Sequence, residues 1–277
     1  MSEAVSLTGL DYLAHVTSVI GKGGAYVLLC ALLSAYCLLK RARSGEPLLR
    51  ASLSPLEQLA WLMWAYWVFG TLLNQALKFT IAQPRPWWID PASPPLSPEP
   101  SMGFGMPSGH AQGAVGMWLF AYHIRRLSAE RSICVTRLQL TLCLASCGLW
   151  VPLTMWARVA LNAHSVAQVC AGLTVGLLWS LALTRLTRAR RGVSLLSALF
   201  ALCLITLSYH LTQPAAVPEQ WLEVIRQEVS APLWFKPKPK VLVALLTAGL
   251  GLSWAWWRHM RSEAAHQATP EISPPQP

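Results

Sequence analysis

Long apolar runs alternate with short polar segments along most of the chain. The runs cover residues 24–39, 56–77, 111–124, 138–157, 166–184, 193–211 and 241–257. A helix that crosses a membrane needs about 20 mostly apolar residues, and several of these runs reach that length once a few flanking residues are added. The pattern predicts an all-α fold, a polytopic membrane helix bundle with about seven spans (six to seven).

The composition supports this prediction. Hydrophobic residues make up 54% of the 277 residues, charged residues only 12%, and the mean hydropathy is +0.40. These values are too apolar for an ordinary soluble domain. We expect residues 1–262 to form a single membrane-embedded domain, and residues 263–277, which are polar and rich in proline, to be a disordered tail.

The positions of the basic residues predict the orientation of the spans. Four groups follow the first, third, fifth and seventh runs: Lys40, Arg41, Arg43 and Arg50; Arg125, Arg126, Arg131 and Arg137; Arg185, Arg188, Arg190 and Arg191; and Arg258 and Arg261. All four groups fall on one face of a seven-span bundle, which the positive-inside rule makes cytoplasmic. The net charge of +10 then needs no nucleic-acid partner, because topology and anionic membrane lipids account for it. The loops 78–110 and 158–165 are expected on the outer face.

Three cations lie where apolar runs meet this outer face: Lys78, Arg85 and Arg158. A cation inside a span costs about 2.5–3.5 kcal/mol even on the lenient insertion scale. Such residues therefore either extend to the membrane interface or line a polar cavity.

The stretch GFGMPSGHAQGAVG, residues 103–116, favours the polar cavity. We expect Pro107 at a first helical position, followed by Ser108, Gly109 and His110 in the first turn, where free N–H groups and the helix dipole favour a phosphate. A second histidine, His164, is expected on the same face. Two histidines and three cations at one membrane edge suit phosphoryl transfer, since guanidinium groups clamp phosphate oxygens while imidazoles serve as nucleophile and acid.

These residues carry a family resemblance. The segments 78–86 (Lys, six residues, Arg-Pro), 107–110 (Pro-Ser-Gly-His) and 158–168 (Arg, five residues, His) resemble the three-part signature of the type 2 phosphatidic acid phosphatase superfamily. That superfamily includes lipid phosphate phosphatases, undecaprenyl pyrophosphate phosphatases, glucose-6-phosphatase and the vanadium haloperoxidases. The signature spans about a third of the chain.

The resemblance implies a role for each matched residue. His164 would be the nucleophile that forms a phosphohistidine, and His110 the general acid for the leaving group. The phosphate would be held by the remaining matched residues: Lys78, Arg85, Ser108, Gly109 and Arg158. The resemblance implies no metal and no cofactor, and the sequence places no carboxylate-rich cluster near the two histidines.

The chain departs from the family pattern at two positions. Ala157 stands where the family usually has serine, and Gln168 where it usually has the aspartate four residues after the nucleophile. Residues four apart on a helix are neighbours, so the Gln168 oxygen can still orient the His164 ring. Gln168 either weakens catalysis or marks a branch with a neutral partner. The second interpretation agrees with glucose-6-phosphatases, which this chain resembles locally in H-x-x-x-Q and in Trp87-Trp88; that tryptophan pair either sits in the interfacial belt or walls the site.

The sequence thus predicts a metal-independent membrane phosphatase acting at the outer face. A lipid phosphate or isoprenyl diphosphate is the favoured substrate, and a sugar phosphate is the alternative. A catalytically silent lipid-binding membrane protein is the alternative of another class. The size of the chain and the absence of an endoplasmic-reticulum signal at its C-terminus favour a bacterial inner membrane with the site facing the periplasm. The oligomeric state does not follow from the sequence.

Overall fold

A computed structural model describes residues 9–21, 23–45, 53–90, 94, 96, 103–187, 192–228 and 239–268. Within these ranges all regular secondary structure is helical, so the predicted all-α class is confirmed there. In chain order the helices are α1 (Gly9–Ile20), α2 (Gly23–Arg43), α3 (Pro55–Ile81), α4 (Pro86–Ile89), α5 (Gly109–Ala129), α6 (Arg137–Ala160), α7 (Val166–Leu186), α8 (Gly192–Thr212), α9 (Glu219–Glu228) and α10 (Pro239–Ala268).

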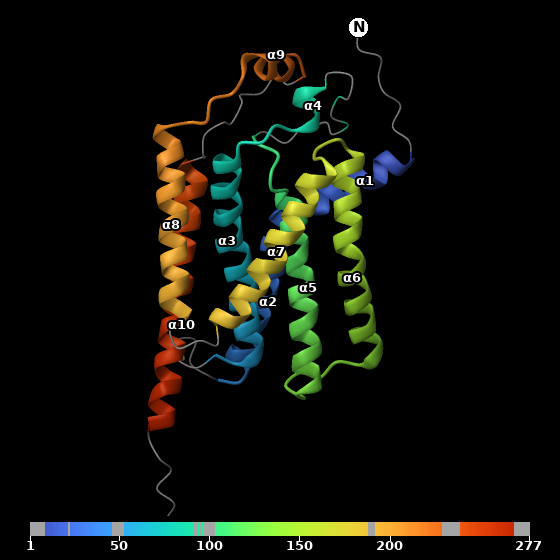
Figure 1. Cartoon of the computed structure of the whole chain (residues 1–277). Coiled ribbons are helices and arrows are strands. Elements are labelled where there is room, and N and C mark those ends of the chain that lie inside the picture. The colour runs from blue at the N-terminus through green and yellow to red at the C-terminus, as the bar shows by residue number, and fades with distance from the viewer. Residues whose placement is uncertain are drawn as a thin grey trace, which may run out of the picture.

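Seven long helices correspond to the seven apolar runs: α2, α3, α5, α6, α7, α8 and α10. They run alternately down and up through the bundle (Figure 1). Three helical segments in the described part of the chain are long and apolar enough to cross a membrane: Arg137–Ala160, Val166–Leu186 and Ser194–Thr212. These features are those of an integral membrane protein.

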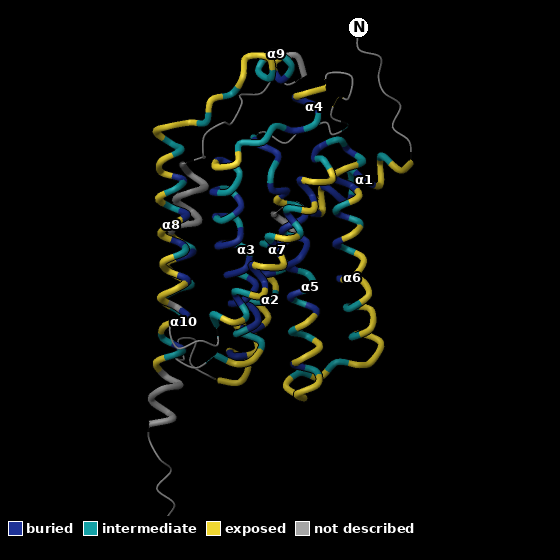
Figure 2. Tube along the Cα trace, viewed as in Figure 1, coloured by how far each residue is buried: buried dark blue, intermediate teal, exposed yellow. Residues whose placement is uncertain are grey.

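Helix α3 lies at the centre of the bundle and packs against α2, α5, α7, α8 and α10. It is apolar on all sides, as expected of a helix surrounded by others. Its Trp61, Tyr66 and Phe69 belong to the main hydrophobic core together with Trp179 of α7 and Phe200 of α8. The helices around α3 expose large apolar residues, such as Leu149 of α6 and Leu202 of α8. Exposed positions along both helices are yellow in Figure 2. Lipid, and not water, suits such a surface.

The two ends of the bundle differ in charge. The described members of the four basic groups lie at the end drawn at the bottom of Figure 1, which we call the basic end. Arg50, Arg188, Arg190 and Arg191 lie outside the described residues. The opposite end, which we call the site end, holds the end of α3, the start of α5 and the turn between α6 and α7. All three signature segments therefore fall at one end, as expected.

Several local features differ from expectation. Helix α10 continues to Ala268, so residues 263–268 are helical and do not belong to a disordered tail; residues 269–277 lie outside the described part. Pro107 is not the first residue of a helix. It follows a cis peptide bond, Ser108 is the N-cap, and α5 begins at Gly109.

A short helix that the apolar runs did not predict, α1, lies at the site end and packs against α6. Its Ala14 has no exposed surface and contacts the buried Ala157, Leu161 and Ala163. Other positions of α1 expose large apolar side chains, such as those of Leu10 and Tyr12. With 12 residues it is too short to span a bilayer, but an apolar face of this kind suits the membrane interface.

Candidate active site

The turn between α6 and α7 folds His164 back over Arg158. The backbone N–H groups of Ala163 and His164 both donate to the carbonyl oxygen of Arg158, at 3.1 Å each. Asn162, at the bend, has a positive φ of 52°, a conformation that asparagine tolerates better than most residues. The five-residue spacing between Arg158 and His164 thus produces a tight turn that places both side chains in one buried site.

Arg85 faces the ring of His164. Its Nη1 lies 3.3 Å from Nε2 of His164 and donates to the carbonyl oxygen of Ala163 at 2.6 Å. Its Nε donates to the carbonyl oxygen of Gly103 at 2.8 Å. Arg85 and His164 are each 3% exposed. The guanidinium is therefore fixed by backbone carbonyls on two sides and presents its edge to the imidazole.

Lys78 approaches from the last turn of α3. Its Nζ donates to the carbonyl oxygen of Phe104 at 2.7 Å, and Nη2 of Arg85 lies 3.4 Å from the same oxygen. The Phe104 ring makes edge contacts with Phe79 and Trp88, at centroid separations of 6.1 and 6.0 Å. Aromatic packing therefore fixes the carbonyl that holds two of the cations.

The tryptophan pair supports this wall. Trp87 and Trp88 are each 1% exposed, and Trp88 also lies against Trp221 of α9. They are core residues under the site, and neither belongs to an exposed interfacial belt. The sequence left open whether these tryptophans sit in the interfacial belt or form a wall of the site, and the structure favours the wall of the site.

The start of α5 completes the site from another side. The Ser108 N–H donates to the carbonyl oxygen of Gln168 at 3.0 Å, which ties this N-cap to α7. The Ser108 side chain has no exposed surface, and its Oγ has no hydrogen-bond partner among the described residues. A buried hydroxyl in this state is destabilising unless a ligand satisfies it. Gly109 and His110 follow in the first turn of α5.

Gln168 contacts His164 as expected, since its Oε1 lies 3.2 Å from Nδ1 of the imidazole. The same oxygen accepts from the N–H of Ser165 at 3.2 Å, and the Ser165 hydroxyl accepts from the Gln168 N–H, which forms a capping box at the start of α7. The Gln168 Nε2 donates to the carbonyl oxygen of Pro84 at 2.7 Å. The amide thus joins the helix start, the imidazole and the segment that carries Arg85.

One contact of Arg158 was missed by sequence reasoning. Its Nη1 donates to the hydroxyl of Ser18 near the end of α1, and both side chains are buried. The two residues are 140 positions apart in the chain, and no motif surrounds Ser18 that could have signalled the contact. The structure therefore adds α1 to the elements that form the site.

The charges in the site favour an anion. Lys78 and Arg85 donate to neutral backbone carbonyls, and among the described residues neither forms an ion pair with a carboxylate. Burial, followed by the positive charges of Arg85, Lys78, Arg158 and His110, holds the pKa of His164 well below its usual range. His164 is therefore a neutral imidazole at pH 7, while the surrounding cations can bind phosphate oxygens.

The site is assembled without a recognisable metal-binding cluster in the described part of the chain. No three His, Cys, Asp or Glu side chains there are grouped so that they could hold a metal ion. The ring of His164 contacts the Arg85 guanidinium and the Gln168 amide, and neither contact is with a carboxylate. Among the described residues the arrangement is one for holding an anion.

Comparison with known proteins agrees with this geometry. A family model described as the PAP2 superfamily matches residues 58–192, which include Lys78, Arg85, His110, Arg158 and His164. This match, over a little under half of the chain, supports membership of the PAP2 superfamily.

Two further similarities were found. The glucose-6-phosphatase catalytic subunit 1 of Haplochromis nubilus is 32% identical over 128 residues, a match that covers 40% of this chain and 36% of that protein. The chain thus matches little more than a third of that relative's length. The crystal structure of a transmembrane PAP2-type phosphatidylglycerolphosphate phosphatase from Bacillus subtilis aligns with a TM-score of 0.46 and 23% identity, covering 65% of this chain and 77% of the other.

Proposed function

We propose that this protein is a membrane phosphatase that hydrolyses a phosphate ester through a phosphohistidine formed on His164. The observation that carries the proposal is the buried His164 ring, held between the Gln168 oxygen at Nδ1 and the Arg85 guanidinium at Nε2. An acceptor at Nδ1 favours the tautomer with its proton there, which leaves the lone pair on Nε2. That lone pair points toward the cations that would bind phosphate.

In the proposed reaction, Lys78, Arg85 and Arg158 bind the non-bridging oxygens, together with the Ser108 hydroxyl and the Gly109 N–H. Nε2 of His164 attacks phosphorus, the bond from phosphorus to the ester oxygen breaks, and His110 gives its proton to that oxygen. His110, now neutral, takes a proton from water, which attacks the phosphohistidine. The bond from phosphorus to Nε2 breaks, inorganic phosphate is released, and both histidines return to their starting states.

The electrostatics of the site support this sequence of steps. The lowered pKa of His164 keeps its lone pair available at neutral pH, because burial and neighbouring cations disfavour the imidazolium. An incoming phosphate offsets those cations and stabilises the charge that develops on the ring. Fixed donors aimed at the developing charge supply the main electrostatic term in such catalysis.

We place the site on the outer side of the membrane, in a bundle of seven spans. The basic groups that end or follow α2, α5, α7 and α10 lie at the end opposite the site, and the positive-inside rule makes that end cytoplasmic. In a bacterial inner membrane the site would face the periplasm.

A lipid phosphate or isoprenyl diphosphate is the favoured substrate class, because the site lies where membrane helices meet the interface. A sugar phosphate is the second candidate, favoured by the 32% identity over 128 residues to glucose-6-phosphatase catalytic subunit 1. Both would use the same phosphate-binding residues, so they differ only in what surrounds the leaving group.

Phosphate release by detergent-purified protein tests the proposal. The substrates are phosphatidate, undecaprenyl pyrophosphate and glucose 6-phosphate, assayed with chelator and without added metal. We expect release that is lost in His164→Ala and retained in His123→Ala, a matched histidine near the basic end of α5. Full turnover in His164→Ala would contradict the mechanism, and no release from any substrate would favour the catalytically silent lipid-binding alternative.

A further inference from the structure

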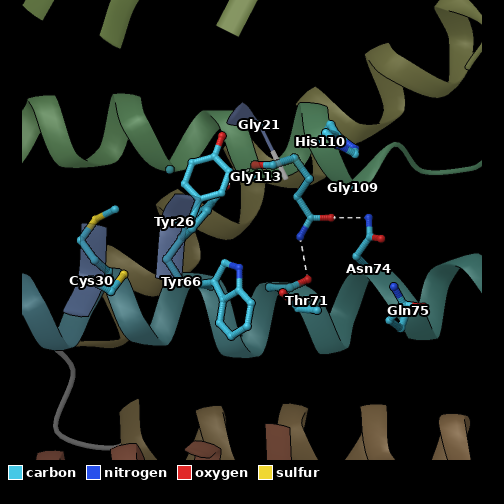
Figure 3. A pocket seen from close by; sticks show the side chains of 15 residues that line it. Gly21, Tyr26, Cys30, Tyr66, Thr71, Asn74, Gln75, Gly109, His110 and Gly113 are labelled. Atoms are coloured by element: carbon cyan, nitrogen blue, oxygen red, sulfur yellow. Dashed lines mark hydrogen bonds between the residues drawn. The ribbon is translucent and has the colours of Figure 1, made fainter. Parts of the chain in front are cut away.

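A cavity of about 240 Å³ opens beside the proposed acid His110 and runs between α2, α3 and α5 (Figure 3). Gly21, Gly109 and His110 line one end, and Cys30 and Met63 line the other. The catalytic steps proposed above use only His110 and Gly109 of its lining residues. The rest of the cavity therefore needs a separate explanation.

The cavity is long and narrow. Along α3 its lining extends from Gln75 to Met63, which corresponds to about 18 Å of helix. One leaflet of the hydrocarbon core is about 15 Å thick, so the cavity is as deep as a leaflet. A group the size of a water molecule occupies about 30 Å³, so the cavity volume of about 240 Å³ holds roughly eight such groups. These dimensions suit an extended chain better than a compact ring.

Four of the polar side chains that line the cavity, those of Tyr26, Tyr66, Asn74 and Gln112, are engaged with the protein. Asn74 Nδ2 donates to Gln112 Oε1 at 2.8 Å, and Gln112 Nε2 donates to the Gly70 carbonyl oxygen at 2.8 Å, as the dashed lines in Figure 3 show. The Tyr66 hydroxyl donates to the Gln112 carbonyl oxygen at 2.6 Å, and the Tyr26 hydroxyl accepts from Trp150 at 3.0 Å. These four side chains therefore make their hydrogen bonds within the protein, and a hydrocarbon chain requires none from them.

Apart from Thr71, Gln75 and His110, the rest of the lining is apolar or glycine. Gly113 and Gly116 of α5 face the aromatic side chains of Tyr26 and Tyr66, so that a Cβ added at either position would lie 3.3 Å or 2.8 Å from a ring carbon. None of the described residues that line the cavity is Asp, Glu, Lys or Arg. Larger residues on this face of α5 would close the cavity.

We infer that this cavity binds a single hydrocarbon chain of the substrate, on the leaving-group side of the phosphate. The inference deepens the proposed function, because His110 at the mouth is where the leaving oxygen would take its proton. The chain that leaves with that oxygen would extend from His110 toward Cys30. The substrate class is then a phosphate ester of a long-chain alcohol or a lipid, because Cys30 and Met63 make the deep end of the cavity apolar.

Calorimetric binding of n-alkylphosphonates from methyl to dodecyl tests the inference without requiring turnover. We expect the affinity of the wild-type protein to rise roughly three- to four-fold per methylene up to about eight carbons and then level off. Gly113→Leu, which fills the middle of the cavity, should end the rise within the first few carbons. Gly148→Leu is the matched control, because a Cβ at Gly148 on α6 meets nothing within 4 Å.

Cys30→Phe provides a second variant at the deep end, where a change does not touch α5. It should shorten the chain length at which the affinity levels off, with no change for methylphosphonate. Equal dependence on chain length in wild type, Gly113→Leu and Cys30→Phe would overturn the inference. Chain-dependent binding without any phosphate release would instead overturn the proposed phosphatase function and leave the cavity assignment intact.

Discussion

At the scale of single residues, Gln168 shows why an amide fits a position where the family usually has a carboxylate. Its oxygen faces Nδ1 of His164 and the Ser165 N–H, while its nitrogen donates to the Pro84 carbonyl oxygen. A carboxylate would satisfy the first two groups but would place an oxygen against the Pro84 carbonyl. The departure from the family pattern therefore has a structural reason in the segment that carries Arg85.

Gln168→Glu should consequently lower activity. A carboxylate cannot donate to the Pro84 carbonyl oxygen, and leaving a buried carbonyl without a donor costs about 1–3 kcal/mol. If this cost falls on the transition state, kcat/KM drops roughly five- to 150-fold. Steady-state assays of Gln168→Glu against wild type measure the effect. A variant with wild-type or higher kcat/KM would show that the amide nitrogen has no role in the site.

The pH dependence tests the state of His164. Burial and the nearby cations lower the pKa of His164, so its imidazole stays neutral as the pH falls from 8 to 6.5. The rate of phosphoenzyme formation should therefore not decline over that interval through protonation of His164. A carboxylate at Nδ1 stabilises the imidazolium, so Gln168→Glu should move the acid limb to higher pH. Rapid-quench rates across this range measure both profiles. An acid limb of the wild type above pH 7, unmoved in Gln168→Glu, would contradict the assignment.

Ser18→Ala tests the contribution of α1. The substitution removes the hydroxyl that accepts a hydrogen bond from the buried Arg158 guanidinium. Hydrogen bonds to charged groups contribute about 1.5–3 kcal/mol, so kcat/KM should fall roughly 10- to 150-fold. The fall should come mainly from a higher KM. Ser18→Thr should retain most of the activity. Thr206→Ala on α8 is the control, since the Thr206 hydroxyl donates to the Leu202 carbonyl oxygen of its own helix. Equal kinetics for Ser18→Ala and Thr206→Ala would remove Ser18 from the site.

The residue types and their spacing were sufficient to predict which side chains meet. Lys78, Arg85, His110 and Arg158 all act on His164 through their charges, and Gln168 contacts its ring. The acceptors that hold these groups were not predictable, because most are backbone carbonyls, such as those of Phe104 and Ala163. Carbonyl positions depend on tertiary packing and leave no signal in the sequence.

At the scale of helices, close packing of α7 on α5 sets the position of the phosphate-binding turn. A Cβ added at Gly172 of α7 would lie 2.3 Å from the Ser108 carbonyl oxygen, and one at Gly176 would lie 2.9 Å from that of Gln112. Backbone atoms cannot yield as a flexible side chain can. The two glycines, one turn apart, allow α7 to approach the start of α5.

Gly172→Ala should therefore damage both stability and activity. Overpacking at a backbone contact lowers the free energy of unfolding by about 1–3 kcal/mol, and the strain falls directly on Ser108. Thermal unfolding in detergent and phosphate release measure the two effects. Gly148→Ala, with open space around its Cβ, should behave as wild type. A Gly172→Ala protein that matched Gly148→Ala would show that α7 and α5 are not in such close contact.

The long helices were predictable because apolar runs determine them, and their caps agree with the sequence. Ser54 with Glu57, and Thr136 with Gln139, form capping boxes where α3 and α6 begin. Helix α1 was missed because its 12 residues are too few for a span and its apolar face is identified only by the helix it packs on. The length of α10 was underestimated because residues 263–268 (EAAHQA) contain no large apolar residue, although they continue a regular helix.

At the scale of the whole molecule, the basic end and the site end define an orientation that labelling can test. Cys134, exposed between α5 and α6, lies at the basic end, and Gln213, exposed after α8, lies at the site end. In intact expressing cells, a membrane-impermeant maleimide should label Gln213→Cys but not the native Cys134. Lysed cells should label both. Labelling of Cys134 alone in intact cells would reverse the orientation and place the site in the cytoplasm.

The central claim is that His164 carries the phosphoryl group during turnover. The most direct measurement is rapid alkaline quench of the purified protein with a ³²P-labelled phosphate ester, followed by peptide mapping of the labelled residue. We expect a label on His164 that is stable to alkali and lost in acid, as is usual for a phosphoramidate. The label should be absent from His164→Ala and present in His123→Ala. Steady phosphate release with no labelled intermediate, or a label on another residue, would contradict it.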